Sequence, residues 1–251
     1  MNKLILGISI IALSLFSCEQ SPKPNLFVKG KIEGVRKATI YLQKMQDTLL
    51  VDLDSVALLG NENFELETYV EEPQLMFLYL KQFGSEEDAE YFDFFAEAGE
   101  FQFKLNAEGF NQAIAEKAPE NQLKYQTYLA TLKRFNDQNL DLISERIQTN
   151  ENDTLAMRTL NEKYASLLRR KYLYTINYAM KNNAHEIAPF LMLSEAYDAN
   201  KKFLDTVFNS LTPKVRNSKY GKELENLIEL RAQEAKQQNI EVKTIDEEMD
   251  S

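Results

Sequence analysis

The residue types that most often carry out chemistry are scarce in this chain of 251 residues. It contains one cysteine, Cys18, and one histidine, His185. Without a second cysteine the chain can form no internal disulfide, CxxC redox pair or cysteine-based metal site. A single histidine excludes histidine-rich metal sites and leaves any Ser-His-Asp triad dependent on one residue. We therefore expect no metal and no cofactor.

The sharpest motif is a pair of aspartates, Asp52 and Asp54, within the apolar stretch 49–56. This DxDxV pattern resembles the first motif of haloacid-dehalogenase-like phosphatases. The resemblance implies that Asp52 attacks phosphate, that Asp54 is an acid/base and that magnesium lies between them. That fold needs alternating β and α elements after the motif, whereas Gly60-Asn61 and another alternating strand follow here. We expect two carboxylates on an exposed strand, assign no catalytic residue, and keep an Asp-based phosphohydrolase as a third alternative.

Three other polar features are better explained by a structural role than by a binding or catalytic one. Arg169-Arg170-Lys171 and the tyrosines of 172–178 could form a nucleic-acid or glycan surface. However, 39 acidic residues against 29 basic ones give a net charge of -10, which disfavours nucleic acid, and tyrosines at helical spacing favour a core. We expect His185 in a turn between helices. The acidic stretch 86–90 lacks the DxDxDG spacing of a calcium loop, which predicts a solvated turn.

The N-terminal segment has the pattern of an export signal. Lys3 precedes an uncharged apolar run, residues 4–16, which is shorter than the roughly 20 residues that span a membrane. The run ends in Ser17 and Cys18, and Leu15-Phe16-Ser17-Cys18 resembles the bacterial lipobox. The resemblance implies cleavage between Ser17 and Cys18 and acylation of the Cys18 thiol. We expect a signal peptide at 1–17, a polar tether at 18–25 and acyl chains such as palmitate that hold the protein to a membrane.

Glycine content and periodicity divide the remaining chain in two. All but one of the eight glycines precede residue 110. In this part, alternation of apolar and polar residues predicts strands with one exposed face, and residues 75–80, apolar on both faces, predict a central strand. We predict seven strands, at 26–32, 38–43, 49–58, 64–70, 75–80, 91–96 and 101–105. Their number and shortness favour a β-sandwich-like domain at 26–108.

From residue 121 the apolar spacing changes to three and four, which predicts a helical domain at 119–232. Ile143 and Ile147 are expected to lie on a packed helix face, and apolar residues on both faces of 172–180 predict a buried central helix. Thr212-Pro213 predicts a helix start. The last helix is expected to end near Arg231, before an acidic flexible tail at 233–251. The predicted fold class is α+β, an N-terminal antiparallel β-sandwich-like domain followed by an all-helical segment.

Four short motifs of the β part resemble the domain-of-unknown-function 4369 family, namely residues 28–34, 39–42, 53–56 and 60–66. The resemblance covers residues 26 to about 105 by motif and the helices to about 232 by arrangement. It implies the N-terminal part of an envelope lipoprotein whose C-terminal part is usually thioredoxin-like. Only the acidic segment stands where that domain would begin, and the chain has no CxxC. The resemblance therefore implies no redox activity, places the DxDS segment in a strand and transfers no catalytic residue.

We expect a non-enzymatic, lipid-anchored protein of a Gram-negative cell envelope that binds or positions a partner or ligand. The expected partners are the membrane, through the N-terminal acyl chains, and another envelope protein, whereas the charge excludes nucleic acid. We expect the anchor in the outer membrane, with the periplasmic face and the cell surface both open. The alternative is an accessory subunit that acts in trans with a thioredoxin-like thiol-disulfide enzyme.

Overall fold

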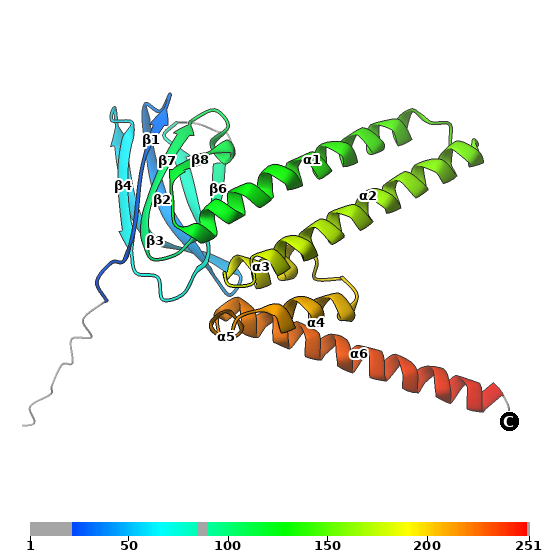
Figure 1. Ribbon diagram of the computed structural model, residues 1–251. Helices are drawn as coiled ribbons and strands as arrows, with labels where there is room; N and C mark the ends of the chain where they lie inside the picture. Colours follow the sequence, from blue (N-terminus) through cyan, green and yellow to red (C-terminus); the bar gives the residue numbers. More distant parts are fainter. Residues whose placement is uncertain (1–21, 85–89, 250–251) are drawn as a thin grey trace, which may run out of the picture.

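The computed structural model describes residues 22–84 and 90–249, where two four-stranded sheets are followed by helices (Figure 1). The first sheet has the order β4-β1-β7-β8, formed by Asn63–Thr68, Leu26–Glu33, Gly99–Asn106 and Ile114–Lys117. The second has the order β3-β2-β5-β6, formed by Leu49–Leu59, Lys37–Gln46, Gln74–Gln82 and Glu90–Ala96. This α+β architecture and all seven predicted strands are confirmed. The short β8, which follows the 3-10 helix η1 (Phe110–Gln112), was not predicted, because four residues are too few to show a period.

The two sheets pack face to face around a shared apolar core. Inward-facing side chains alternate along each strand, and the core includes Leu26, Val28 and Ile32 of β1 and Met76, Leu78 and Leu80 of β5. One pairing differs from the predicted antiparallel arrangement, because β1 runs parallel to β7. The Gly99 N–H donates to the Asn25 carbonyl at 2.9 Å, so both strands begin at the same end of the sheet. A parallel pair requires a long connection, which β2 to β6 supply here.

Gly30 lies on the inward side of β1, where the core leaves no room for a side chain. A Cβ at this position would lie 2.6 Å from the ring of Phe64 and 2.7 Å from the carbonyl oxygen of Phe103. The ring of Phe64, which is buried, therefore covers the backbone of Gly30. A glycine inside a strand often marks such a close approach.

The helices begin directly after β8. Their bounds are Glu120–Gln148 (α1), Thr154–Lys181 (α2), Ile187–Glu195 (α3), Lys201–Ser210 (α4), Pro213–Arg216 (α5) and Lys219–Met249 (α6). The predicted start at Thr212-Pro213 is confirmed, with proline in the first turn. The C-terminal end of α1 and the start of α2 project away from the sandwich (Figure 1). Ile143 and Ile147 lie on this projecting part. Ile143 is 44% exposed and lines a hollow with Leu160 and Tyr164 of α2, whereas Ile147 is 80% exposed, so its predicted place on a packed face was wrong.

The last helix, α6, extends beyond its predicted end near Arg231 and continues to Met249. The acidic segment is therefore helical as far as Met249, where we expected a flexible tail. Its residues explain the difference, because alanine, glutamate, glutamine and lysine are strong helix formers and no glycine or proline follows Gly221.

A buried polar network joins the sandwich to the helices. The Asn121 side chain at the start of α1 donates to Glu97 and Glu186, both at 3.0 Å, and accepts from the Ile187 N–H at 3.0 Å. The neighbouring Gln122 accepts from the Phe95 N–H of β6 at 2.7 Å. Buried polar groups are costly unless they are hydrogen-bonded, so this set of bonds fixes the positions of α1 and α3 on the sheet.

Aromatic packing surrounds this network. Phe95 lies on the outer face of β6, 5.3 Å from the ring of Phe190 and 5.8 Å from that of Tyr220. Tyr125 of α1 packs against both Phe95 and Phe190. Part of the outer face of the second sheet is therefore buried beneath α1, α3 and α6.

Replacing Gly30 by valine is expected to lower the free energy of unfolding by about 2 kcal/mol, because the added atoms overpack the core against Phe64. Urea unfolding measures the loss. Lys29→Val, on the exposed side of the same strand, is the control and should change stability by less than about 0.5 kcal/mol. Equal losses for the two variants would contradict the close contact at Gly30.

Glu186 is expected to make stability depend on pH. Burial would raise the pKa of Glu186, but hydrogen bonds from Asn121 and Lys214 outweigh it, so the pKa lies below the usual 4.5. A folded-state pKa below the unfolded one stabilises the protein above pH 4.5, and this contribution disappears as the pH falls through the folded value. Glu186→Gln should therefore be less stable than wild type at neutral pH, and the difference should shrink in acid.

Urea midpoints at neutral and acidic pH measure this dependence. Glu151→Gln, an exposed change in the turn between α1 and α2, is the control and should follow the wild-type profile. A constant difference between Glu186→Gln and wild type at all pH values would show that ionised Glu186 does not stabilise the fold.

Candidate functional site

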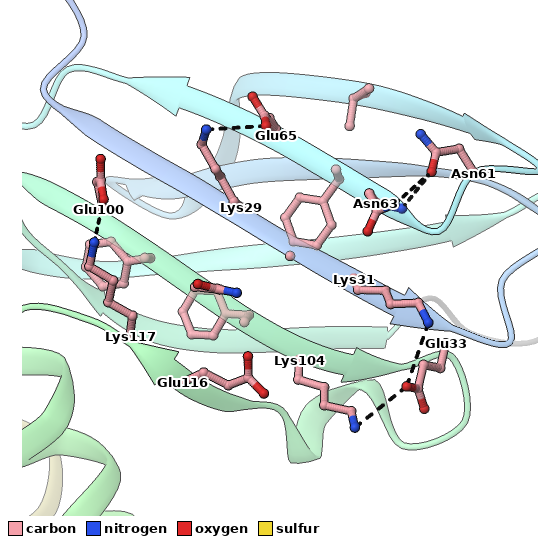
Figure 2. Close-up of a pocket in the computed structure, with 16 residues that line it drawn as sticks. Lys29, Lys31, Glu33, Asn61, Asn63, Glu65, Glu100, Lys104, Glu116 and Lys117 are labelled. Carbon is pink, nitrogen blue, oxygen red and sulfur yellow. Dashed lines mark hydrogen bonds and ion pairs between the residues drawn. The ribbon is translucent and has the colours of Figure 1, made fainter.

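A hollow of about 940 Å³ lies over the outer face of the first sheet (Figure 2). Its four lysines each lie beside a glutamate, in the pairs Lys29–Glu65 (3.3 Å), Lys31–Glu62 (3.2 Å), Lys104–Glu33 (3.7 Å) and Lys117–Glu100 (2.6 Å). The hydrogen bond from Lys117 lowers the pKa of Glu100. The four lysines and their glutamate partners balance in charge, so this face has no excess of either sign that would attract a charged ligand.

A second hollow, of about 660 Å³, lies where the helices meet the second sheet, and we call it the junction groove. One wall is the end of β2 with Met45, and the other wall is formed by Phe190 of α3 and Tyr220 of α6. Leu75 and Phe77 of β5 lie between the walls. Ligand sites typically have volumes of about 300–1,000 Å³, an apolar lining with few polar groups, and positions at domain junctions. The junction groove has the volume and the position of such a site, although six of its eleven lining residues are polar or charged.

The aromatic wall of the junction groove is held in a fixed position. The Leu75 N–H donates to the Tyr220 hydroxyl at 3.0 Å, and the rings of Phe190 and Tyr220 lie 5.1 Å apart. Burial raises the pKa of Tyr220 to about 12, so the hydroxyl stays neutral at physiological pH. The aromatic wall is therefore rigid and mostly buried, with Phe190 and Tyr220 9% and 8% exposed, and the Lys219 ammonium lies over the Tyr220 ring.

The rim of the junction groove carries charges of both signs. The rim contains two basic residues, Lys44 and Lys219, and two acidic residues, Asp47 and Glu223. The N-terminus of α6 is already occupied, because the Lys219 N–H donates to Glu72 at 2.6 Å. An apolar aromatic interior within a polar rim is the composition of a protein-binding surface.

The outer face of the second sheet continues beyond the groove as a row of tyrosines. Tyr41, Tyr79 and Tyr91 are directly opposite one another on β2, β5 and β6. Ring centroids lie 5.5 Å apart for Tyr41 and Tyr79 and 4.7 Å apart for Tyr79 and Tyr91. The next row contains Gln43 beside Phe77. Aromatic side chains of this amphipathic kind are enriched at interfaces, so the row extends the candidate surface.

The two predicted site carboxylates, Asp52 and Asp54, lie on the edge strand β3, as the strand interpretation expected. Asp52 accepts from the Gln43 amide at 2.6 Å. Asp54 accepts from the N–H groups of Ser55 and Glu67, both at 2.8 Å, and so links β3 to β4 of the other sheet. Both have structural partners, and among the described residues no group of three or more acidic, histidine or cysteine side chains could hold a metal.

The basic and aromatic residues of α2 serve the helical packing. The rings of Tyr174 and Tyr178 lie 5.6 and 5.4 Å from that of the buried Tyr128, which confirms the core interpretation. Lys171 pairs with Glu195 at 2.9 Å. His185 lies between α2 and α3, with Nε2 at 3.3 Å from Glu120, which confirms the predicted turn.

The other sequence candidates lie outside the described residues. These are Ser17, Cys18 and most of the acidic stretch, residues 86–89. No helix in the described part of the chain is long and apolar enough to cross a bilayer.

Sequence reasoning missed the junction groove. Its residues come from β2, β5, α3 and α6, so no local motif contains them. The one available signal was the two-sided apolar character of 75–80, which indicated that something covers the outer face of this strand.

Comparison with protein families gives one match, to the model of a domain of unknown function, DUF4369, over residues 27–132. No curated protein matches the chain. The match includes β8 and the part of α1 that ends with the buried Leu132, so the sandwich and the packed half of α1 form one unit. Residues 27–132 of the chain therefore form a domain of the DUF4369 family.

Proposed function

We propose that this protein is a non-enzymatic, lipid-anchored protein of a Gram-negative envelope that binds a partner protein through the junction groove. The junction groove is the observation that carries the proposal. It joins an apolar floor, Leu75 and Phe77, to a fixed aromatic wall, Phe190 and Tyr220. Aromatic residues and methionine are enriched in the centres of protein interfaces, and Met45 of the opposite wall is 45% exposed.

The lipid anchor in this proposal rests on the sequence pattern that ends in Ser17-Cys18. Acyl chains on Cys18 would hold the protein to the outer membrane against its net charge of -10. The tether of residues 18–25 leads directly into β1, which begins at Leu26. The sandwich would therefore lie within a short distance of the membrane surface.

Replacing Cys18 by alanine is expected to remove acylation and release the protein from the membrane. Each buried CH2 of an acyl chain contributes about 0.8 kcal/mol, so the loss of the chains should shift the protein to the soluble fraction. Metabolic labelling with palmitate and membrane fractionation measure the two effects, and Ser21→Ala is the control. Wild-type protein without acyl label, or Cys18→Ala protein that stays in the membrane, would contradict the anchor.

Met45→Glu is expected to reduce partner binding about tenfold, because it replaces an exposed apolar side chain of the groove by a carboxylate. Cross-linking in cells, followed by affinity purification and quantitative proteomics, measures the partner recovered. The control is Ile147→Glu, an equally drastic change at the exposed end of α1. Recovery of the same proteins in equal amounts from wild type and Met45→Glu would contradict binding in the groove.

The identity of the recovered protein separates the two envelope functions. A thioredoxin-fold enzyme lost from Met45→Glu but kept by Ile147→Glu would assign the accessory role in thiol-disulfide exchange. Any other protein with this pattern would assign the general binding role.

A further inference from the structure

A further row of side chains adjoins the tyrosine row on the outer face of the second sheet. Four residues lie directly opposite one another on β3, β2, β5 and β6 and form what we call the aspartate row, namely Asp52, Gln43, Phe77 and Asp93. Successive side chains of a strand point to opposite faces, and the neighbours Leu42 and Leu78 belong to the sandwich core. The aspartate row therefore points away from the core, toward the side on which the junction groove lies.

The aspartate row carries negative charge without a counter-ion. Asp52 is exposed, and within residues 22–84 and 90–249 it accepts one hydrogen bond, from Gln43 at 2.6 Å, and forms no ion pair. Asp93 accepts from the Tyr125 hydroxyl, which is neutral. Of the neighbouring lysines, Lys44 is opposite the core residue Met76, on the other face, and Lys81 lies beyond the tyrosine row. This part of the sheet therefore complements a positively charged group.

Gln43 adds an acceptor that has no donor. The residue is only 7% exposed, and its amide nitrogen donates to Asp52, which leaves the carbonyl oxygen on the other arm of the amide. This oxygen is buried and accepts no hydrogen bond from the described residues. A buried acceptor without a partner costs free energy, and native proteins contain few of them. The aspartate row thus lacks a hydrogen-bond donor beside its exposed carboxylate.

Aromatic rings surround these acceptors. Phe77 lies next to Gln43, and Tyr41 and Tyr79 of the tyrosine row are half-buried one row away. The face of an aromatic ring carries negative electrostatic potential and attracts cations. Burial, the neighbouring Tyr79 and the charge of Asp52 raise the pKa of Tyr91, so the negative potential of Asp52 extends across the tyrosine row to β6. The ring faces, the carboxylate and the free carbonyl oxygen all favour a cationic hydrogen-bond donor.

We propose that the aspartate row binds the guanidinium group of an arginine side chain of the partner protein, with Asp52 and the Gln43 carbonyl oxygen as its acceptors. A guanidinium is planar, stacks on aromatic rings and presents five N–H donors in a fixed fork, whereas a lysine ammonium is compact and strongly hydrated. The inference rests on the proposed function and names the side chain by which the partner is recognised. Because the Gln43 oxygen is buried in the free protein, the entering guanidinium has to displace a side chain above it, which makes the Gln43 amide a direct reporter of binding.

The test is an NMR titration of the purified protein with N-acetylarginine amide. The side-chain amide signals of Gln43, identified by their absence from Gln43→Met, should shift and saturate with a dissociation constant in the millimolar range, on the order of 1 mM. N-acetylcitrulline amide has nearly the same shape without the charge and should bind at least about tenfold more weakly. Gln43 signals that do not move at tens of millimolar, or equal affinities for the two compounds, would overturn the proposal.

Two variants assign the acceptors. Asp52→Asn keeps an oxygen for the Gln43 amide but removes the charge, and it should weaken binding of N-acetylarginine amide at least about fivefold. Asp54→Asn is the matched control on the same strand and should bind as wild type, because Asp54 is opposite the core residue Leu42. Gln43→Met keeps the size of the side chain without the oxygen and should also weaken binding. Undiminished binding by Asp52→Asn or Gln43→Met, or an equal loss in Asp54→Asn, would contradict the assignment.

Partner recovery from cells separates this inference from the proposed function. The protein that is lost from Met45→Glu should also be lost from Asp52→Asn and kept by Asp54→Asn. A partner lost from Met45→Glu but fully recovered with Asp52→Asn would support the junction groove and overturn the arginine contact. If Met45→Glu recovers every protein that wild type does, the groove fails as the partner site, and the titration with N-acetylarginine amide still decides whether the aspartate row binds a guanidinium.

Discussion

The amide of Asn121 is buried between two structural units, and the arrangement of both units depends on satisfying it. Its donors reach Glu97, at the turn after β6, and Glu186, before α3, while its oxygen accepts from the Ile187 N–H. Lys214 of α5 pairs with Glu186 at 3.1 Å and extends the network to a third helix. A buried polar group without partners costs as much as several apolar contacts contribute, so a helix shifted along the sheet would leave these groups unpaired. Apolar packing brings the units together, and the network selects one register.

That register determines which surfaces stay open. The helices cover the Leu75 and Phe95 end of the second sheet and leave the Tyr41, Tyr79 and Tyr91 end uncovered. The junction groove forms at the boundary, where the β2–β3 hairpin faces the start of α6. The edge strand β3 lies beyond the reach of the helices, which explains why Asp52 remains exposed. A single docking geometry therefore generates the groove, the tyrosine row and the open end of the aspartate row.

Most of the fold could be predicted from local patterns, and its errors have distinct physical causes. Seven strands were visible because alternation reports a half-buried strand directly. The parallel pairing of β1 with β7 was not visible, because periodicity shows which residues face inward but not which strand lies alongside. Ile147 has the spacing of a packed helix face but is 80% exposed, since this end of α1 projects beyond the sandwich. The extent of α6 followed helix propensity rather than charge.

For the candidate site, the sequence alone located the carboxylates Asp52 and Asp54 on a strand. It also argued against catalysis, because the turn and the strand that follow them can be predicted from local sequence patterns. It also placed the lone cysteine in a lipobox-like segment, on which the proposed anchor rests. Only the tertiary structure decided where a partner could bind, because the junction groove combines residues from β2, β5, α3 and α6. Local period determines the face on which a side chain lies. What covers that face depends on contacts between residues far apart in the chain, and these form only when the helices dock.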